Sequence, residues 1–209
     1  MININLKIDT IFDVGSNNGD YSLLFNQIYP GAKIFAFEPN PYLTKIAIKK
    51  IKEFQNVKII QKAVGNLNSS TTLNIDQNSS LTTSLAIANK NSTTYKIKKF
   101  LYGNELKKLT TIKIIKLDSF IKNNNSPDFV KIDVEGFEEE VLKGLTNNLK
   151  NIKLIMIEFH FDKLYKKYST RSIHRLLMKN NFKLVKSVKF PILKWEDRFY
   201  INTKLARSF

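Results

Sequence analysis

Compact apolar runs alternate with amphipathic stretches in the first third of the chain. The runs Thr10–Val14 and Lys33–Phe37 are continuous enough to predict buried strands. Each is followed by apolar residues at helical spacing, over Tyr21–Ile28 and from Pro41 to Phe54, and proline is favoured in the first turn of a helix. Val57–Val64 predicts a third strand.

The same alternation returns in the second half of the chain. The predicted elements are a strand at Asp128–Val134, a helix at Phe137–Leu149, a strand at Ile152–Phe159, a helix at Thr170–Asn180, and strands at Phe182–Lys189 and Arg198–Thr203. Strands that alternate with helices predict an α/β fold, a mainly parallel sheet with helices on both faces.

Residues 66–116 break this pattern because they are rich in Asn, Ser and Thr. Two pieces favour strands, Thr71–Ile75 and Thr111–Leu117, whereas Ser79–Asn104 indicates a loop or irregular structure. At 209 residues the chain fits one domain. We therefore expect a single domain over residues 1–209, with residues 66–116 inserted over one edge.

Composition narrows the class of protein. The hydrophobic fraction of 43% is typical of a globular domain, and no apolar run reaches the roughly 18 residues that cross a bilayer. The absence of cysteine excludes disulfides and thiolate metal sites. The amino terminus lacks the charged-then-apolar pattern of a secretory signal, so we expect a cytoplasmic protein.

The formal net charge of +16 is unevenly placed. Between Lys163 and Lys194 there are ten Lys or Arg residues and no Asp or Glu. A continuous basic surface there would attract a polyanion or an anionic membrane, which would place the protein at the membrane periphery. The alternatives are a solvated charged face and compositional drift, since the chain is also rich in Asn and Ile.

The segment after the first predicted strand, from Asp13 to Gly19, is a candidate ligand loop. In such sheets ligands bind beyond the carboxyl ends of the strands, and Gly15 and Gly19 allow sharp turns and close approach. Dinucleotide enzymes need a middle glycine where this chain has Asn17. S-adenosylmethionine has no phosphate, and its ammonium group could pair with Asp13.

Glu38 supports a nucleoside ligand. It ends the second predicted strand, 19 residues after Gly19, where an acidic residue can bind both ribose hydroxyls. The alternative is a tight turn and an unrelated surface glutamate. The loop and the carboxylate together favour the nucleoside site.

Three segments resemble one family in particular, the FkbM-type methyltransferases. These are Phe12–Ser22, Ala36–Pro41 and Val130–Gly136, supported by Lys62–Gly65, Leu117–Phe120 and Ile157–His160. The resemblance runs from about Ile11 to His160. It implies a class I methyltransferase (Rossmann-like) fold with a seven-stranded sheet whose last strand is antiparallel. It also implies S-adenosylmethionine as donor and O-methylation, often of a sugar hydroxyl in a glycan.

The resemblance also implies roles for individual residues. The methionine end of the cofactor would lie against Asp13, Gly15 and Gly19, the ribose on Glu38, and the adenine near Ala63 and Val64. The rest of the predicted cofactor site is formed by Ser16, Asn17, Pro39 and Asp133. Alanine and a small apolar residue are more usual in the family at Ser16-Asn17-Asn18, so the loop contacts to the cofactor tail depart from its pattern.

Candidate catalytic residues lie at the ends of the fourth and fifth predicted strands. Asp133 and Glu135 are two residues apart, which would place both on one face of a strand. Asp133 could accept the acceptor's hydroxyl proton or help to bind a hard cation such as Mg²⁺. His160 is the second candidate base, and Glu158 could orient it.

Several charged residues have a structural interpretation. Glu138–Glu140 are expected to complement the dipole of the following helix, and Asp118 is expected to cap a short one. His174, on a basic helix, is expected to be structural.

The predicted activity is O-methylation of a hydroxyl on a sugar, glycan or glycolipid. The main alternative is an RNA ribose 2′-O-methyltransferase, because of the charge. Asn40-Pro41-Tyr42 superficially resembles the motif of amino-methylating DNA enzymes, but it follows the wrong strand and lacks their second proline. A nicotinamide-dependent oxidoreductase and a catalytically silent binding protein are further alternatives.

Overall fold

The computed structural model describes residues 6–76, 85–93, 95–97, 107–121, 126–161, 164–190 and 195–205. The described helices are α1 (Asp20–Ile28), α2 (Pro41–Ile51), α4 (Leu117–Ile121), α5 (Glu138–Lys143), α6 (Thr170–Lys179) and the 3₁₀ helix η1 (Leu149–Asn151). The strands are β1 (Thr10–Val14), β2 (Lys33–Phe37), β3 (Val57–Ile60), β4 (Ala63–Val64), β5 (Ser69–Asp76), β6 (Lys107–Ile115), β7 (Phe129–Ile132), β8 (Leu154–His160), β9 (Phe182–Phe190) and β10 (Trp195–Asn202).

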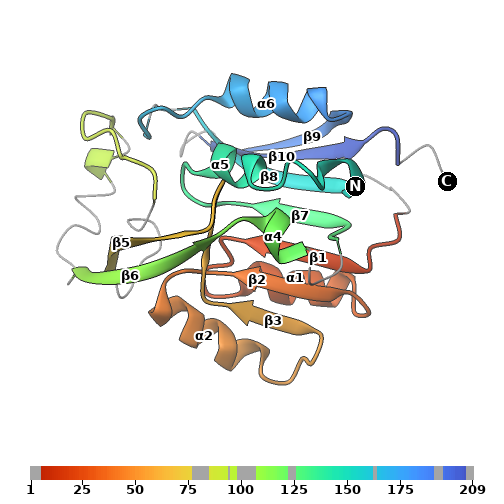
Figure 1. The fold of residues 1–209 in the computed structure, drawn as a ribbon, viewed down its shortest axis with the longest axis horizontal. Coiled ribbons are helices and arrows are strands. Elements are labelled where there is room, and N and C mark those ends of the chain that lie inside the picture. Colours follow the sequence, from red (N-terminus) through yellow and green to blue (C-terminus); the bar gives the residue numbers. More distant parts are fainter. Residues whose placement is uncertain are drawn as a thin grey trace.

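Seven strands form the main sheet in the order β3-β2-β1-β7-β8-β10-β9 (Figure 1). The pairs along β3, β2, β1, β7 and β8 are parallel, whereas β10 runs antiparallel to both β8 and β9. The predicted topology is confirmed, including the antiparallel last strand. Strand order reverses between β1 and β7, which is where ligands bind in such sheets.

Both faces of this sheet are covered, as the alternation in β1 shows. Phe12 and Val14 pack in one core cluster with side chains of α4, α5 and α6, whereas Ile11 packs in a second cluster with Phe25 of α1 and Ile51 of α2. Successive strand residues point to opposite faces, so one buried strand supports both layers of helices. Helices on both faces were predicted and are confirmed.

The prediction of one continuous strand over Val57–Val64 is wrong, because the segment forms two strands. The Lys62 amide donates to the Ile60 carbonyl at 2.8 Å, and this turn divides the segment into β3 and β4. β3 ends the main sheet, while β4 pairs with β6 in a separate three-stranded sheet of order β4-β6-β5. A run of apolar residues could not reveal that turn.

Within the predicted insertion, β5 and β6 form an antiparallel pair, which extends to the left of the main sheet in Figure 1. The predicted piece Thr71–Ile75 lies within β5, and most of Thr111–Leu117 lies within β6, although Leu117 begins α4. Most of Ser79–Asn104 lies outside the described residues, and the single-domain organisation stays a prediction.

The predicted helix over Phe137–Leu149 is shorter than expected. α5 ends at Lys143, and Gly144 caps it where a Cβ atom would lie 2.0 Å from the Gly65 carbonyl oxygen. The chain continues through turns into η1. Contact with a neighbouring backbone, which periodicity does not encode, ends this helix.

Several residues with a structural interpretation make structural contacts. The Asn40 side chain accepts a hydrogen bond from the Tyr42 amide and caps α2, so Asn-Pro-Tyr is a helix start. His174 Nδ1 lies 2.9 Å from the Tyr200 hydroxyl. The prediction that Asp118 caps its helix is wrong, because it lies inside α4 and accepts hydrogen bonds from residues 147 and 148.

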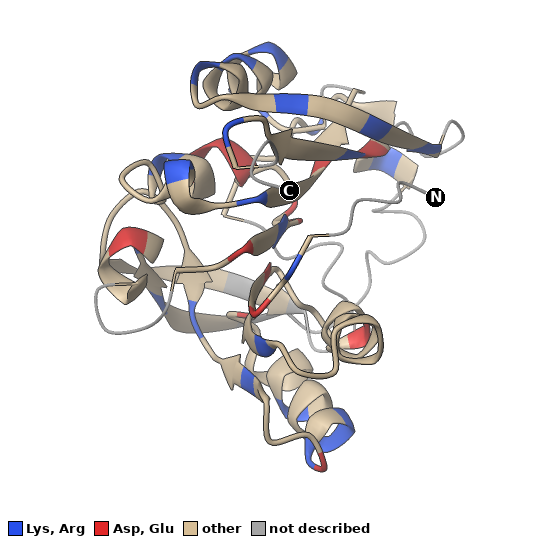
Figure 2. Cartoon of the chain, turned by 90° about the vertical axis from the view of Figure 1, so that its right-hand side faces the viewer, with Lys and Arg blue, Asp and Glu red and all other residues tan. Residues whose placement is uncertain are grey.

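One basic surface covers α6 and β9. Figure 2 shows Lys and Arg on the uppermost helix, α6, and on the strand beneath it. Its exposed members are Arg171, Arg175, Lys179, Lys183, Lys186 and Lys189. Lys163 and Lys194, the predicted bounds of the basic region, lie outside the described residues.

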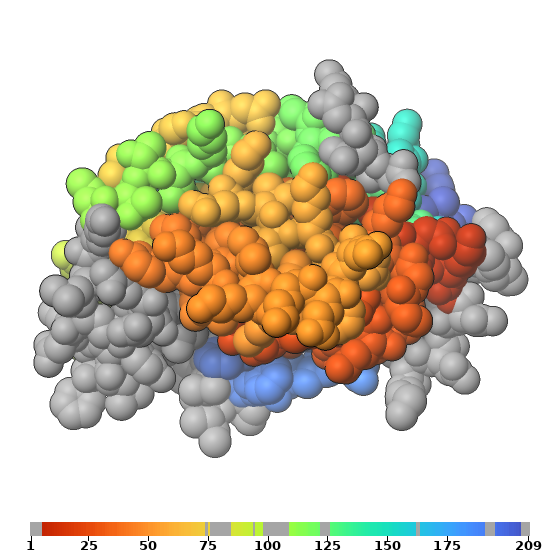
Figure 3. Space-filling view, turned by 90° about the horizontal axis from the view of Figure 1, so that it is seen from below, coloured from red at the N-terminus to blue at the C-terminus, as the bar shows by residue number. Residues whose placement is uncertain are grey.

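The opposite end of the sheet is covered differently. Seen from below, α2 and β3 form most of the surface in orange, with the green of β6 along its upper border (Figure 3). The edge strand β3 exposes Lys58, and a charged residue on an edge disfavours pairing with other chains. No helix in the described part of the chain is long and apolar enough to span a bilayer.

Candidate active site at the ends of β1, β2, β7 and β8

The loop after β1 is held against two other strands. Gly15 has φ of 77°, and a Cβ atom there would lie 1.8 Å from the Asp133 carbonyl oxygen after β7. The Gly15 and Ser16 amides both donate to the Phe37 carbonyl at 3.0 Å. Only glycine fits this conformation and this close approach. The loop therefore packs against the ends of β2 and β7, at the point where strand order reverses.

Glu38 fixes the same loop from β2. One of its carboxylate oxygens accepts from the Asn17 amide at 3.0 Å and the other from the Asn40 amide at 2.8 Å. The residue is 6% exposed. Burial raises the pKa of Glu38 to about 7, against the opposing effect of the two amides and of Lys131.

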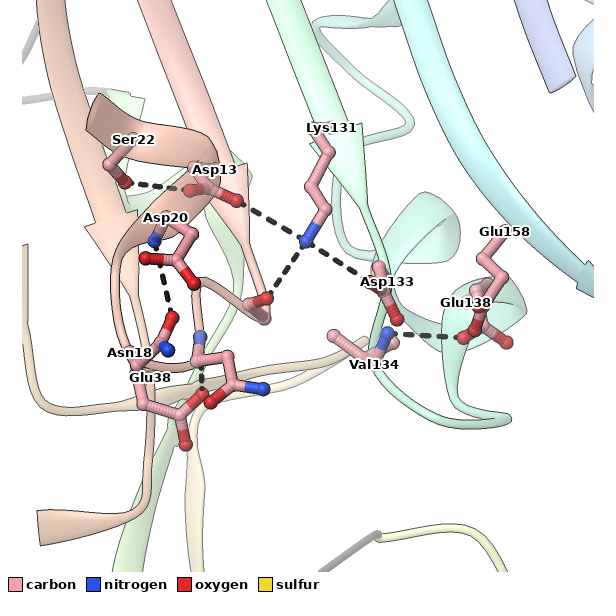
Figure 4. Close-up of polar contacts among 12 residues, drawn as sticks. Asp13, Asn18, Asp20, Ser22, Glu38, Lys131, Asp133, Val134, Glu138 and Glu158 are labelled. Atoms are coloured by element: carbon pink, nitrogen blue, oxygen red, sulfur yellow. Dashed lines mark hydrogen bonds and ion pairs between the residues drawn. The ribbon is translucent and has the colours of Figure 1, made fainter. Parts of the chain in front are cut away.

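A buried lysine joins β1 to β7. The Lys131 amine lies 3.4 Å from Asp13 Oδ1 and 3.3 Å from Asp133 Oδ2, and it donates to the Gly15 carbonyl at 2.9 Å (Figure 4). Burial alone would lower the pKa of Lys131, but the carboxylates of Asp133 and Asp13 raise it above its ordinary value. Sequence reasoning assigned Lys131 no role, although a lysine inside a strand buried on both faces is itself a signal.

Two of the predicted cofactor residues lie behind the loop instead of facing the cavity. Asp13 is fully buried and accepts a hydrogen bond from the Ser22 hydroxyl at 2.6 Å, in addition to its ion pair with Lys131. Gly19 has φ of 85° and caps α1 against Ala47.

The ends of β7 and β8 bring together the predicted catalytic residues. Asp133 and Glu135 were predicted to share one strand face. However, β7 ends at Ile132, so both residues lie in the loop that follows it. Glu135 has φ of 54°. All three candidates, Asp133, Glu135 and His160, still line one cavity because the loop returns toward β8.

Glu158 and His160 form a buried pair in β8. Glu158 Oε2 lies 2.9 Å from His160 Nε2. Burial raises the pKa of Glu158 to about 8. Burial alone would lower the pKa of His160, but Glu158 raises it to about 9.

The loop after β7 is held by side chains with no predicted site role. Glu138 is fully buried and accepts a hydrogen bond from the Val134 amide at 3.1 Å (Figure 4). It also accepts one from the Gly136 amide at 3.0 Å. Tyr165 donates a hydrogen bond to Glu135. Glu138 was predicted only to complement the helix dipole. Hydrophobic periodicity does not reveal that its side chain turns back to bind the amides of the preceding loop.

These groups surround one cavity of about 430 Å³, within the range of small-molecule sites. The predicted site residues that line it are Gly15, Ser16, Asn17, Glu38, Pro39, Ala63, Val64, Asp133, Glu135 and His160. Sequence reasoning missed Lys131, Phe190, Trp195 and Asp197, which also line it. The last three lie on or beside β9 and β10, beyond the segments that carried a motif.

A sequence profile of the methyltransferase FkbM domain matches residues 13–184. The hexuronic acid methyltransferase AglP of Haloferax volcanii is 31% identical over 154 residues, which make up 73% of this chain and 56% of AglP. The chain thus spans little more than half the length of this curated relative.

Two solved structures show the same fold. The precorrin-6y C5,15-methyltransferase of Geobacter metallireducens aligns with a TM-score of 0.52 at 12% identity, over 95% of this chain and 82% of its own. Fibrillarin of Aeropyrum pernix, in complex with S-adenosyl-L-methionine, aligns with a TM-score of 0.54 at 10% identity, over 92% and 66% of the two chains.

Proposed function

The chain belongs to the FkbM methyltransferase family, as its motifs predicted, and we propose that it is an S-adenosylmethionine-dependent O-methyltransferase whose acceptor is a sugar in a glycan or glycolipid. The observation that carries this proposal is the Glu38 carboxylate, which faces the cavity beside the loop of Gly15. An acidic residue at that position can accept both hydroxyl hydrogens of a ribose.

The residues around the cavity fit this cofactor. Gly15 leaves the backbone open where any side chain would collide with Asp133. The Ser16 hydroxyl is buried in the cavity wall without a hydrogen-bond partner among the described residues, so it is available to a ligand. Ala63 and Val64 offer an apolar wall for an adenine ring.

Asp13 and Gly19 would act through the loop rather than touch the cofactor. Asp13 is occupied by Ser22 and Lys131, and Lys131 in turn holds the Gly15 carbonyl. We therefore propose Asp13 as a positioning residue for the loop, and Asn17 and Pro39 as the cavity-facing groups beside Glu38.

The proposed chemistry needs an activated methyl group and a base. When bound, S-adenosylmethionine would supply a methyl group on a sulfonium, which becomes a neutral thioether once the acceptor oxygen has taken the methyl group. Asp133 is the first candidate to accept the hydroxyl proton, because its side chain lines the cavity and its carboxylate is held 3.3 Å from the Lys131 amine. His160, paired with Glu158, is the second, and it would act in the neutral form that its raised pKa of about 9 favours only at high pH. A divalent cation such as Mg²⁺ would assist by acidifying the hydroxyl.

The acceptor assignment draws on the relative AglP and on the cavity wall. Phe190 and Trp195 line the cavity with ring centroids 5.8 Å apart, and aromatic faces suit the apolar faces of sugar rings. The strand β9, which carries part of the basic surface, ends at Phe190 in the cavity wall. Its charge would favour an anionic acceptor, such as a uronic acid, or an acceptor on an anionic lipid.

Transfer of a labelled methyl group tests the proposal. We expect labelling of glycans or lipid-linked sugars that contain a uronic acid, and weaker labelling of matched neutral sugars, with rates that fall at high salt. The comparison acceptor is RNA. Preferential labelling of RNA would contradict the sugar assignment and support the ribose 2′-O-methyltransferase alternative.

Cofactor affinity is expected to depend on pH through Glu38. Its pKa is raised to about 7 by burial, and ribose hydroxyls would donate to the ionised carboxylate only. Binding is therefore favoured above pH 7 and lost as the pH falls through it. Calorimetry should show roughly tenfold weaker binding at pH 6 than at pH 8. Lys131 and Asp13 also act on Glu38, but Glu38→Gln alone should remove most of the pH dependence. An unchanged pH profile in that variant would contradict the assignment.

A further inference from the structure

Three side chains with metal-binding groups converge where β7 and β8 end. They are Glu135, Glu158 and His160, and one ligand atom from each lies within 4.8 Å of the other two. All three line the cavity. Carboxylate oxygens and an imidazole nitrogen at this spacing can share one cation.

The contact between Glu158 and His160 is unusual for a buried ion pair. Glu158 Oε2 and His160 Nε2 are 2.9 Å apart, with side chains 12% and 5% exposed, yet neither atom makes a hydrogen bond of normal geometry with a described residue. Buried polar atoms without an aligned partner cost free energy and require an explanation. Two ligand atoms directed at a common cation, and not at each other, have this arrangement.

The third ligand is held in place by its surroundings. Glu135 is in the left-handed region, φ 54°, which is uncommon for a residue with a side chain and recurs at functional sites. Tyr165 donates a hydrogen bond to the Glu135 carboxylate. The Tyr165 ring also packs so closely on Gly136 that a Cβ atom at residue 136 would lie 2.3 Å from the nearest ring carbon. Glu138 binds the amides on either side of Glu135. Outer hydrogen bonds of this kind orient metal ligands.

The local charge is opposite to that of the chain as a whole. In a protein of net charge +16, this end of the cavity carries the carboxylates of Asp133, Glu135, Glu158 and Asp197. The amine of Lys131 is already shared between Asp133 and Asp13. Additional positive charge here would stabilise the site.

We propose that Glu135, Glu158 and His160 bind one divalent cation, whose open positions take an oxygen of the acceptor. Two carboxylates and one imidazole leave open positions in an octahedral shell, and this mixed donor set suits Mn²⁺ as well as Mg²⁺. This inference rests on the proposed function. The cation would hold the acceptor oxygen and weaken its O–H bond, and Asp133 would take the proton.

Mn²⁺ binding to the full chain tests this directly, with electron paramagnetic resonance as the readout. We expect one bound ion per chain, and at least tenfold weaker binding in Glu135→Gln and His160→Gln. The matched controls are the exposed Glu53→Gln and His174→Gln, which should bind as the native protein does. Equal binding in all variants, or none in the native protein, would overturn the proposal.

A second measurement needs no variant of the site. The chain has only two histidines, so its imidazole resonances in an NMR spectrum are assigned by His174→Gln. Mn²⁺ should broaden the His160 signals at stoichiometric amounts and spare those of His174. Broadening of neither or of both would contradict the site. Cofactor calorimetry on the same sample separates the two proposals: cofactor binding without metal binding removes only the cation, and the reverse removes the methyltransferase assignment.

Discussion

Replacing Glu38 with alanine is expected to weaken S-adenosylmethionine binding by about a hundred- to ten-thousandfold. Two ribose hydroxyls would each donate to its carboxylate, and a hydrogen bond to a charged group contributes about 1.5–3 kcal/mol. The loss of both is about 3–6 kcal/mol, and each 1.4 kcal/mol is tenfold in affinity. Isothermal calorimetry measures the effect.

The variant also loses a structural contact, because Glu38 accepts from the Asn17 and Asn40 amides. Thermal unfolding of Glu38→Ala and Glu38→Gln therefore belongs beside the calorimetry, with exposed Glu53→Ala as the control. A folded Glu38→Ala protein that binds as tightly as the native one would remove Glu38 from the cofactor site. A native protein that binds no S-adenosylmethionine would overturn the proposed function as a whole.

The Asp133→Asn variant is expected to lose nearly all turnover while it keeps most of its cofactor affinity. The amide cannot accept the hydroxyl proton, and removal of a positioned general base lowers rates by about 10²–10⁴-fold. The contacts of Glu38, Ser16 and Ala63 with the cavity do not involve this side chain. Single-turnover methyl transfer and calorimetry on the same preparation separate the two effects.

The same substitution at Asp9 is the matched control. Asp9 directly precedes β1, at the end of the strand away from the cavity, and its side chain is 61% exposed. Full turnover in Asp133→Asn would exclude Asp133 as the base. It would then point to His160 or to an acceptor carboxylate, since a uronic acid offers an oxygen that carries no proton at neutral pH.

Local sequence patterns predicted the main sheet well because the central strands β1, β7 and β8 are buried on both faces, which gives them continuous apolar runs. The run Thr10–Val14 and the spacing over Tyr21–Ile28 both reappear in the structure within one residue. The second, smaller sheet was less predictable, because the pairing of β4 with β6 depends on contacts distant in sequence.

The candidate site shows the same division. The carboxyl ends of parallel strands meet at one edge, so Glu38, Asp133 and His160 could be placed together from the chain alone. The roles of Lys131 and Glu138 could not be predicted from the chain alone. Each depends on contacts with other segments, Lys131 with Asp13 of β1 and Glu138 with the Val134 amide in the loop after β7.

The sequence by itself determined the family, the alternation of strands and helices that forms the main sheet, and the loop that carries Gly15, because periodicity, glycines and motif spacing are local properties of the chain. Only the tertiary structure decided which charged groups are neutralised and which face the cavity. It buried Asp13 behind the loop, paired Lys131 with two carboxylates, and left Glu135, Glu158 and His160 converging. Coulombic and burial energies depend on distances in space, and those distances exist only once β1, β7 and β8 have packed side by side.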